Sequence, residues 1–412
     1  MSDSTFRAVL EGLQQRPSSV GESPTRPTSV AVLGAGPVGL LLACEALAAG
    51  LDVRLTSLYG QELQVLREAG AITVRGVHLV GSYAIGGAGR QGPAIDVVDS
   101  IDQAVKHVDL IMLAAPALSH STYAGVLAPV LADGQTVLLV PGRFLGVVEF
   151  AETLAAHMAS ADVTLSEVAH PPYLATGDGA AVSVLGLAKS LPCSTLPVDA
   201  SATLCARLES ILPMLCATDS PLDTAFAAIT GVLNVAPLAV NASVLDAGDE
   251  VRLADLVTQG LSGTIMKALD IERREVGFHF GVRDLVPAAT WLRAAFGAES
   301  DQIEDPDLHN ALTDLDAFDD VRIGWDGGPR LTDDVANVLV PLASAGRVAG
   351  VSTPITDMII TLASVLVGSD LSAQGRTLGR VGLGNHPPSE LRRHLAAAGA
   401  RRPRAAMTWQ KV

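Results

Sequence analysis

The chain has 412 residues, a formal net charge of −16 and an estimated pI of about 4.9. Because single hydrophobic cores stop growing near roughly 250–300 residues, this length predicts two domains. This net negative charge argues against nucleic acid or an anionic membrane as the main partner.

The four cysteines form no CxxC pair and accompany no histidine cluster, so we expect reduced core residues, no metal and a cytoplasmic protein. No uninterrupted apolar run of membrane-spanning length and no signal sequence stands out, which predicts no membrane partner. Residues 1–28 are rich in proline, serine and threonine, and we expect a disordered leader there.

The stretch from Ser29 to Gly50 predicts a strand, a glycine turn and a helix. Its turn reads Gly34-Ala35-Gly36-Pro37-Val38-Gly39. Gly34 permits the tight turn, Gly36 lets a pyrophosphate approach the backbone, and Gly39 lets the helix pack closely on the strand. The helix N-terminus offers free N–H groups to phosphates. In this context the turn predicts a dinucleotide-binding Rossmann domain, with its residues as cofactor contacts.

The second strand, from Leu51 to Leu55, ends in Thr56 and Ser57, where such a domain usually carries an acid that binds the ribose of NAD. Without that carboxylate a 2′-phosphate meets no repulsion, and both hydroxyls can donate to it. We therefore predict NADP(H) in preference to NAD(H), with Arg54 or Arg67 reaching the phosphate. The alternative is that Thr56 and Ser57 only end a strand.

Two later strands lead to the same carboxyl edge of the sheet, where open parallel sheets bind ligands. The apolar strand from Asp109 to Ala114 precedes Ala115 and Pro116, which we expect beside the cofactor, and then His120. The next apolar strand precedes Arg143, whose guanidinium suits a substrate carboxylate. His120 and Arg143 are thus candidate substrate contacts, although a capping histidine and an exposed loop arginine are the plainer interpretations.

From Pro221 onward the pattern changes to long helical segments, which predicts an all-α second domain. We place the dinucleotide-binding domain, a doubly wound parallel sheet, at residues 29–200. The helical substrate and dimerisation domain follows at 201–384, and a basic C-terminal helix and tail at 385–412.

Several stretches in one order resemble the octopine and nopaline dehydrogenase family, the opine dehydrogenases. They are the glycine turn, residues 115–120 (APALSH), 141–143 (PGR), 167 with 172–176 (E, PYLAT), 331–335 (LTDDV), 350–355 (GVSTPI) and 375–378 (GRTL). The likeness runs from about Ser29 to Gly384. It implies a Rossmann domain followed by an all-helical domain, with the active site in the cleft between them.

Enzymes of this family condense the amine of an amino acid with the carbonyl of a 2-oxo acid and reduce the imine with NAD(P)H. They use a His–Asp pair as acid and base, and the resemblance puts the aspartate at Asp334. The segment that carries the histidine resembles residues 234–241 (NVAPLAVN), but Val240 stands in the histidine's place. Because a general acid contributes roughly 10²–10⁴-fold, the usual condensation should be slow unless another group acts.

Other polar residues of the helical domain are candidates for the missing role. Asn241 can donate hydrogen bonds but cannot titrate, whereas Lys267 can do either if it faces the cleft. A solvated lysine is the plainer interpretation, because lysine is seldom buried. Arg330 lies close to where the family keeps a substrate-binding arginine. We assign Asp334, Asn234 and Lys267 to catalysis, and Arg330 and Asn241 to substrate binding.

The sequence thus predicts an oxidoreductase that acts on a C=N bond in a small amino-acid-derived metabolite. Because Val240 replaces the expected acid, we expect a preformed or cyclic imine that is already protonated in water. Positioning by Asn234, Arg330 and Asp334 could then suffice. The alternatives are a 2-oxo acid reductase built from the same two domains, and a degenerate homologue that binds nucleotide as a sensor or scaffold. We expect a cytoplasmic homodimer.

Overall fold

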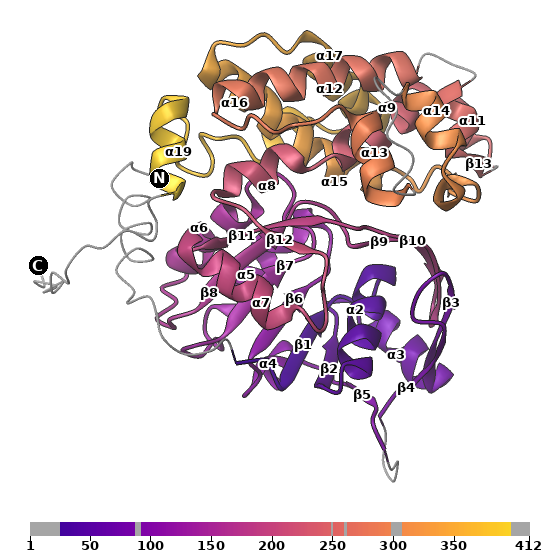
Figure 1. Ribbon diagram of the computed structural model, residues 1–412, viewed down its shortest axis with the longest axis vertical. Helices are drawn as coiled ribbons and strands as arrows, with labels where there is room; N and C mark the ends of the chain where they lie inside the picture. The colour runs from indigo at the N-terminus through magenta and orange to yellow at the C-terminus, as the bar shows by residue number, and fades with distance from the viewer. Residues whose placement is uncertain (1–24, 87–91, 249, 259–261, 298–306, 397–412) are drawn as a thin grey trace, which may run out of the picture.

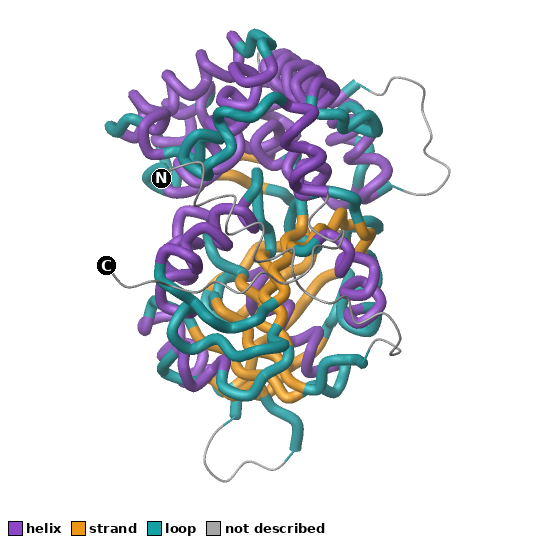
Figure 2. The backbone as a smooth tube through the Cα atoms, turned by 90° about the vertical axis from the view of Figure 1, so that its left-hand side faces the viewer, coloured by secondary structure: helices purple, strands orange, loops and turns teal. Residues whose placement is uncertain are grey.

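The computed structural model describes residues 25–86, 92–248, 250–258, 262–297 and 307–396. An α/β domain forms one half of the molecule, and a mainly helical domain is stacked against it (Figure 1). Turned by 90°, the strands remain in one half and the helical domain stays free of large sheets (Figure 2). The predicted order of an α/β domain followed by a helical one is confirmed.

The first domain is built on an eight-stranded sheet with the order β12-β11-β8-β7-β6-β1-β2-β5. Six neighbouring strands pair in parallel, in the order β5-β2-β1-β6-β7-β8. Strand β11 runs antiparallel to β8 and parallel to β12. The strands are β1 (Ser29–Leu33), β2 (Asp52–Thr56), β5 (Ile95–Val97), β6 (Leu110–Leu113), β7 (Thr136–Leu139), β8 (Thr164–Val168), β11 (Leu191–Leu196) and β12 (Leu215–Ala217).

Helices cover both faces of this sheet, which is why its central strands are apolar throughout. In β1, Val30 and Val32 face one hydrophobic core together with Leu41 of α2, whereas Ala31 and Leu33 face a second core. The helices are α2 (Pro37–Ala48), α3 (Gly60–Ala69), α4 (Ile101–Val105), α5 (His120–Leu127), α6 (Gly146–Ala156) and α7 (Ser201–Leu208), with the 3₁₀ turns η1 (Ala117–Ser119) and η2 (Val198–Ala200). The predicted doubly wound parallel sheet is therefore confirmed for the six parallel strands of this sheet.

A second sheet of four strands, in the order β4-β3-β10-β9, was not predicted from the sequence. It consists of β3 (Ala71–Gly76), β4 (Gly81–Ala84), β9 (Tyr173–Asp178) and β10 (Ala181–Leu187). The parallel pairing of β3 with β10 joins segments more than 100 residues apart, so local sequence patterns cannot reveal it. Gly186 of β10 lies against Phe296 of the helical domain, so this sheet also contacts that domain.

The boundary that we predicted at residue 200 lies too early. Helix α7 and strand β12 follow it, and β12 pairs with β11 in the main sheet. The first domain therefore runs to about residue 217, because the sheet continues beyond the switch from parallel to antiparallel pairing.

The second domain is helical, apart from a two-stranded ribbon of β13 (Val251–Arg252) and β14 (Arg322–Ile323). Its helices are α8 (Pro221–Ala227), α9 (Thr230–Val240), α10 (Ala242–Asp246), α11 (Leu253–Thr258), α12 (Ser262–His279), α13 (Ala288–Phe296), α14 (Leu308–Thr313), α15 (Pro329–Asp334), α16 (Val340–Ala349), α17 (Pro354–Val367), α18 (Leu371–Gln374) and α19 (Pro388–Ala396). A 3₁₀ turn, η3 (Asp316–Phe318), precedes β14, and a π-helical segment, η4 (Val335–Leu339), joins α15 to α16.

One stretch of the described residues, Pro221–Val240, is long and apolar enough by composition to cross a membrane. It contains α8 and α9, and 72% of its apolar 18-residue window is buried inside the structure. Phe226 of α8 stacks edge-on against Phe144 and lies beside Phe280 in the core. The stretch therefore belongs to the hydrophobic interior where the domains meet.

The two ends of the chain are only partly described. Residues 25–28 adjoin the first domain, where Thr28 donates its N–H and its hydroxyl to Asp109 at 2.8 and 2.9 Å. The disordered leader predicted for 1–28 is therefore wrong for 25–28, and its remainder lies outside the described residues. Helix α19 lies within the segment predicted as a basic C-terminal helix and tail, and its Arg392 pairs with Asp223 of α8 at 2.8 Å. Residues 397–412 lie outside the described part.

Candidate active site

A cleft of about 680 Å³ lies between the two domains, in the size range of small-molecule sites. The carboxyl ends of the neighbouring parallel strands β1, β6 and β7 lead into it, as expected for an open α/β sheet. The predicted residues that line it are Gly36, Pro37 and Val38 of the glycine turn, Ala115 and Pro116 after β6, Arg143 after β7, and Arg330 of α15.

The three glycines of the turn have the three separate structural roles that a phosphate-binding turn requires. Gly34 has φ +117°, and a Cβ there would collide with the carbonyl of Ala114. A Cβ at Gly39 would collide with the carbonyl of Gly34, so α2 packs directly on the turn. Gly36 has no atom within 4 Å of a Cβ position, and it lines the cleft. Helix α2 has no side-chain cap, so its N-terminal N–H groups stay available to an anion.

An acid of α3, which the sequence analysis missed, lies beside the carboxyl end of β2. The hydroxyl of Ser57 donates to Oε2 of Glu62, in the first turn of α3, at 2.6 Å. Residues 56–59 contain no acid, as the sequence analysis noted, but a carboxylate from the next helix lies beside them. The missed signal is an acid in the first helical turn after the strand, because such a residue folds back beside the strand end.

The cations expected to reach a 2′-phosphate are engaged elsewhere. Arg54 donates to the carbonyl oxygens of Gln103 and Lys106 at 3.2 and 2.5 Å, at the C-terminal end of α4. Arg67 forms an ion pair with Asp99 at 2.6 Å. Neither arginine lines the cleft.

On the far side of the cleft, Arg143 lies between two adjacent carboxylates. Its Nη1 is 3.0 Å from Oδ1 of Asp334, and its Nη2 is 3.3 Å from Oδ2 of Asp333. Nη1 also donates to the hydroxyl of Thr230. Burial acts to lower the pKa of Arg143, but the carboxylates of Asp334 and Asp333 outweigh it and raise the pKa. Arg143 is thus a structured residue of the domain interface rather than an exposed loop arginine.

Asp334 is fully buried, and Nδ2 of Asn234 donates to its Oδ2 at 3.1 Å. Burial raises the pKa of Asp334 above its ordinary value, although Arg143 acts in the opposite direction. The structure brings the predicted pair of Asp334 and Asn234 together, but neither residue lines the cleft. Asp334 is therefore joined to the cleft wall through its ion pair with Arg143.

Of the two adjacent aspartates, Asp333 is the one that lines the cleft. Its Oδ1 accepts the N–H of Leu118 at 2.9 Å, a bond between the α/β domain and the helical domain. Nδ2 of Asn337, in the π-helical segment η4, donates to the same oxygen at 3.3 Å. Bonds from both domains thus hold this carboxylate in one orientation at the cleft wall. The sequence analysis assigned Asp333 no role in the site, because its hydrogen-bond partners in the first domain lie far away in sequence.

Lys267 does not lie in the cleft. It is exposed on α12 and is absent from the cleft lining, so its assignment to catalysis is wrong. Asn241 also lies outside the cleft, because its Nδ2 donates to the carbonyl of Pro237 and to the hydroxyl of Ser262 at 2.9 and 2.8 Å. Val240 packs against the hydrophobic core of the helical domain, so it contributes no ionisable group.

His120 is fully buried at the start of α5 and does not line the cleft, so its assignment to substrate binding is wrong. Burial, together with the charge of Arg376, lowers its pKa to about 3, which keeps the imidazole neutral. Beside it, Glu167 accepts from the hydroxyl of Thr224 at 2.7 Å and from the N–H of Val147 at 2.8 Å. These buried polar groups lie beneath the loop that carries Arg143.

Comparisons with known proteins agree with this architecture. Residues 217–367 match the family model described as the α-helical domain of NAD/NADP octopine/nopaline dehydrogenase. An opine dehydrogenase of Arthrobacter sp. (strain 1C) is 26% identical over 375 residues, which cover 90% of this chain and 97% of that protein.

Solved structures share the two-domain fold. A structure of octopine dehydrogenase in complex with NADH and agmatine superposes with a TM-score of 0.67 at 18% identity, over 92% of this chain and all of that one. A 2-dehydropantoate 2-reductase from Geobacter metallireducens GS-15 has a TM-score of 0.58 at 15% identity, over 82% of this chain and 99% of that one. Residues 217–367 thus match the helical domain of the octopine/nopaline dehydrogenases, and most of the chain is similar to an opine dehydrogenase.

Proposed function

We propose that the protein is a nicotinamide-nucleotide-dependent oxidoreductase that reduces the C=N bond of a small amino-acid-derived imine. The observation that carries the proposal is one cleft that holds both the glycine turn and the Arg143–Asp333 pair. A nucleotide on one wall and a substrate on the other would meet there.

The nucleotide side of the cleft fits a dinucleotide. Gly36 leaves room for a pyrophosphate, and the uncapped N-terminus of α2 supplies N–H donors and the positive end of a helix dipole. Ala115 and Pro116 continue this wall from the glycine turn towards Arg143. A bound nicotinamide nucleotide would supply the hydride.

The substrate side of the cleft suits a cation with a carboxylate attached. When both aspartates are ionised, the cluster of Arg143, Asp333 and Asp334 has one more negative charge than positive, which favours a protonated imine. Arg330 lines the same cleft from α15 and can bind a carboxylate of the substrate. Since such an imine arrives protonated, hydride addition at its carbon yields the amine without an acid at Val240.

An assay of NADH and NADPH oxidation against three substrate sets tests this proposal. We expect turnover with preformed cyclic imines that carry a carboxylate, and slower turnover with amino acids mixed with pyruvate. Turnover of pyruvate without an amine would instead indicate a 2-oxo acid reductase. Tight nucleotide binding without turnover of any set would indicate a sensor or scaffold.

We further propose that Glu62 makes the protein prefer NAD(H), in place of the NADP(H) preference predicted from the sequence. Its carboxylate lies at the end of β2, where an acid commonly accepts from the ribose hydroxyls and repels a 2′-phosphate. Ser57 already donates its hydroxyl to Glu62, so it is not the donor that a phosphate would need.

The ratio of kcat/KM for NADH to that for NADPH measures this preference. We expect Glu62→Gln to lower the ratio by about tenfold or more, a change of about 1.4 kcal/mol in relative transition-state binding. Glu68→Gln, an exposed carboxylate on the same helix, is the matched control and should leave the ratio unchanged. A wild-type preference for NADPH would overturn the assignment.

We retain the expectation of a cytoplasmic homodimer as a proposal. The chain has a mass of 42.4 kDa, so light scattering on the purified protein should give twice this value.

A further inference from the structure

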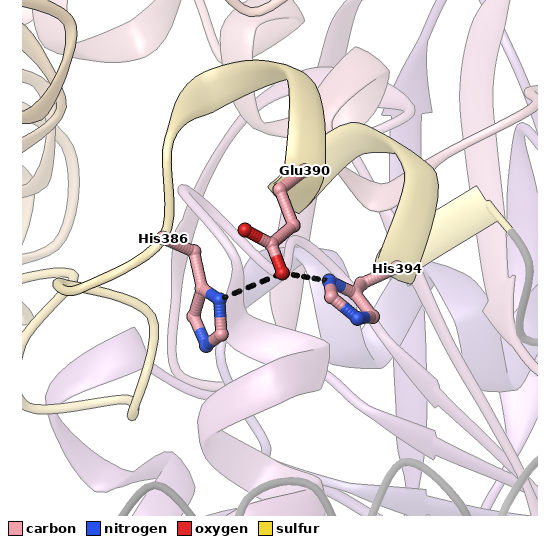
Figure 3. Close-up of side chains that lie close together, drawn as sticks. All are labelled: His386, Glu390 and His394. Atoms are coloured by element: carbon pink, nitrogen blue, oxygen red, sulfur yellow. Dashed lines mark ion pairs between the residues drawn. The ribbon is translucent and has the colours of Figure 1, made fainter.

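Three metal-ligating side chains meet at α19, away from the active-site cleft. His386 precedes the helix, Glu390 lies in its first turn and His394 in its last turn. Figure 3 shows the two imidazole rings directed at the same carboxylate oxygen. None of the three residues lines the cleft, so the oxidoreductase site does not account for them.

The distances between their ligand atoms fit one metal ion. Nδ1 of His386 is 3.6 Å from Oε1 of Glu390, and Nδ1 of His394 is 3.9 Å from the same oxygen. One ligand atom from each of the three residues lies within 4.8 Å of those of the other two. A triangle with these sides has a centre about 2.4 Å or less from each atom, close to the roughly 2.0–2.2 Å of zinc bonds to imidazole nitrogen and carboxylate oxygen.

The surrounding structure holds the ligands in place before any ion binds. Leu391 and Leu395 of α19 are fully buried in the core, so the helix is anchored along one face. Arg392 fixes the same helix to Asp223 of α8 at 2.8 Å. His386 is on the adjoining loop with a side chain that is only 14% exposed. Small side-chain rotations thus suffice to close the three atoms around an ion.

We propose that His386, Glu390 and His394 bind one divalent transition-metal ion, with Zn²⁺ as the preferred ion. Two imidazoles and a carboxylate are a common zinc donor set. The side chains are one-seventh to about one-third exposed, which leaves room for water as a fourth ligand. Residues 397–412 contain no histidine, cysteine, aspartate or glutamate that could replace this water. The ion would join the loop before α19 to both ends of the helix.

Calorimetric titration of the full-length chain with zinc chloride tests the site. The protein must carry no polyhistidine tag and must first be treated with a chelator. We expect saturation at one Zn²⁺ per chain. His386→Gln and Glu390→Gln should each weaken the binding by at least about tenfold, since even the loss of an outer-shell partner costs that much.

Co²⁺ gives a second readout that does not depend on stability. We expect its visible absorption to intensify in the wild-type protein as histidine nitrogens bind, and this change to be lost in His394→Gln. His309→Gln, an exposed histidine on α14, is the matched control and should bind both ions as the wild type does.

Thermal unfolding separates the site from a folding defect. Zinc should raise the Tm of the wild type and of His309→Gln, but not of Glu390→Gln, whose metal-free Tm should match the wild type. Unchanged zinc stoichiometry and affinity in all three site variants would overturn the proposal, as would the absence of saturable binding to the wild type. Because these measurements require no nucleotide or substrate, their result is independent of the proposed oxidoreductase activity.

Discussion

The carboxylate of Asp334 owes its importance to its position behind Arg143. It is fully buried, and it lies 3.0 Å from a guanidinium that lines the cleft. Removing one member of a buried ion pair leaves an uncompensated charge and typically costs about 3–5 kcal/mol. The stability of the protein and the orientation of Arg143 therefore depend on the same side chain.

We predict that Asp334→Asn lowers kcat/KM by about a hundredfold, because Arg143 loses a charged partner while Asn234 keeps a hydrogen-bond acceptor. Steady-state kinetics with the best imine, alongside urea unfolding, would separate the catalytic effect from the loss of stability. Asp314→Asn removes a half-exposed partner of Arg293 and serves as the control. Near-normal kcat/KM in Asp334→Asn would remove Asp334 from the proposed site.

Glu167 gives a prediction about pH. Burial raises its pKa from 4.5 to about 7, although bonds from Thr224 and Val147 and the charge of Arg376 act to lower it. Between pH 4.5 and 7 the folded protein holds a proton that the unfolded chain releases, so this group makes stability fall as pH rises. Below pH 4.5 and above about pH 7 its contribution no longer changes with pH.

We predict that Glu167→Gln removes this dependence, because glutamine stays neutral. The free energy of unfolding of the variant, relative to the wild type, should rise between pH 4.5 and 7 by up to about 3 kcal/mol, at about 1.4 kcal/mol per unit of pKa shift. Urea titrations at several pH values measure this difference. A difference that does not vary with pH would contradict the raised pKa.

At the scale of elements, the N-terminus of α17 is capped by a residue from another helix. Glu272 of α12 accepts the N–H groups of Ile355 and Thr356 at 2.8 and 2.9 Å, and the hydroxyl of Thr356 at 2.6 Å. Thr353 precedes the helix but makes no side-chain cap. The carboxylate thus satisfies free N–H groups and complements the helix dipole.

We predict that Glu272→Ala destabilises the protein by about 2 kcal/mol, as expected for losing hydrogen bonds to a buried charged group. Glu275→Ala changes an exposed carboxylate on the same helix and should have an effect of less than about 0.5 kcal/mol. Urea unfolding of both variants provides the comparison. Equal midpoints for the two would show that Glu272 does not hold α17 in place.

The elements also show what sequence patterns can predict. The glycine turn and its flanking strand and helix were predicted correctly, because their determinants lie within about twenty consecutive residues. The four-stranded sheet was missed because β3 and β10 pair across more than 100 residues. The site residues that were overlooked or misplaced also depend on contacts that are not local in sequence. Glu62 was overlooked because it reaches the end of β2 from the next helix, and Lys267 was misplaced because spacing along a helix does not reveal which face is buried.

At the scale of the whole molecule, Arg376 joins the two domains beneath the cleft. It follows α18 and is almost fully buried, and its Nη2 and Nε lie 2.6 and 2.8 Å from Oε2 of Glu149 in α6. Its Nη1 donates to the carbonyl of Phe144 at 3.0 Å, next to Arg143 in the chain. A residue from the last part of the helical domain therefore supports the loop that places Arg143 in the cleft.

A double-mutant cycle on Arg376→Ala and Glu149→Ala tests this coupling. Because the pair is buried and shares its bonds with the Arg143 loop, we predict a coupling free energy of about 1–3 kcal/mol in urea unfolding. Arg392 and Asp223 form a more exposed pair between α19 and α8, and the same cycle there should give about 1 kcal/mol or less. Arg376→Ala should also speed amide exchange in the Arg143 loop, since two carbonyls of that loop lose a donor. If the Arg376 cycle is additive and exchange is unchanged, Arg376 does not support the loop, which then depends on the contacts of Arg143 with Thr230, Asp333 and Asp334.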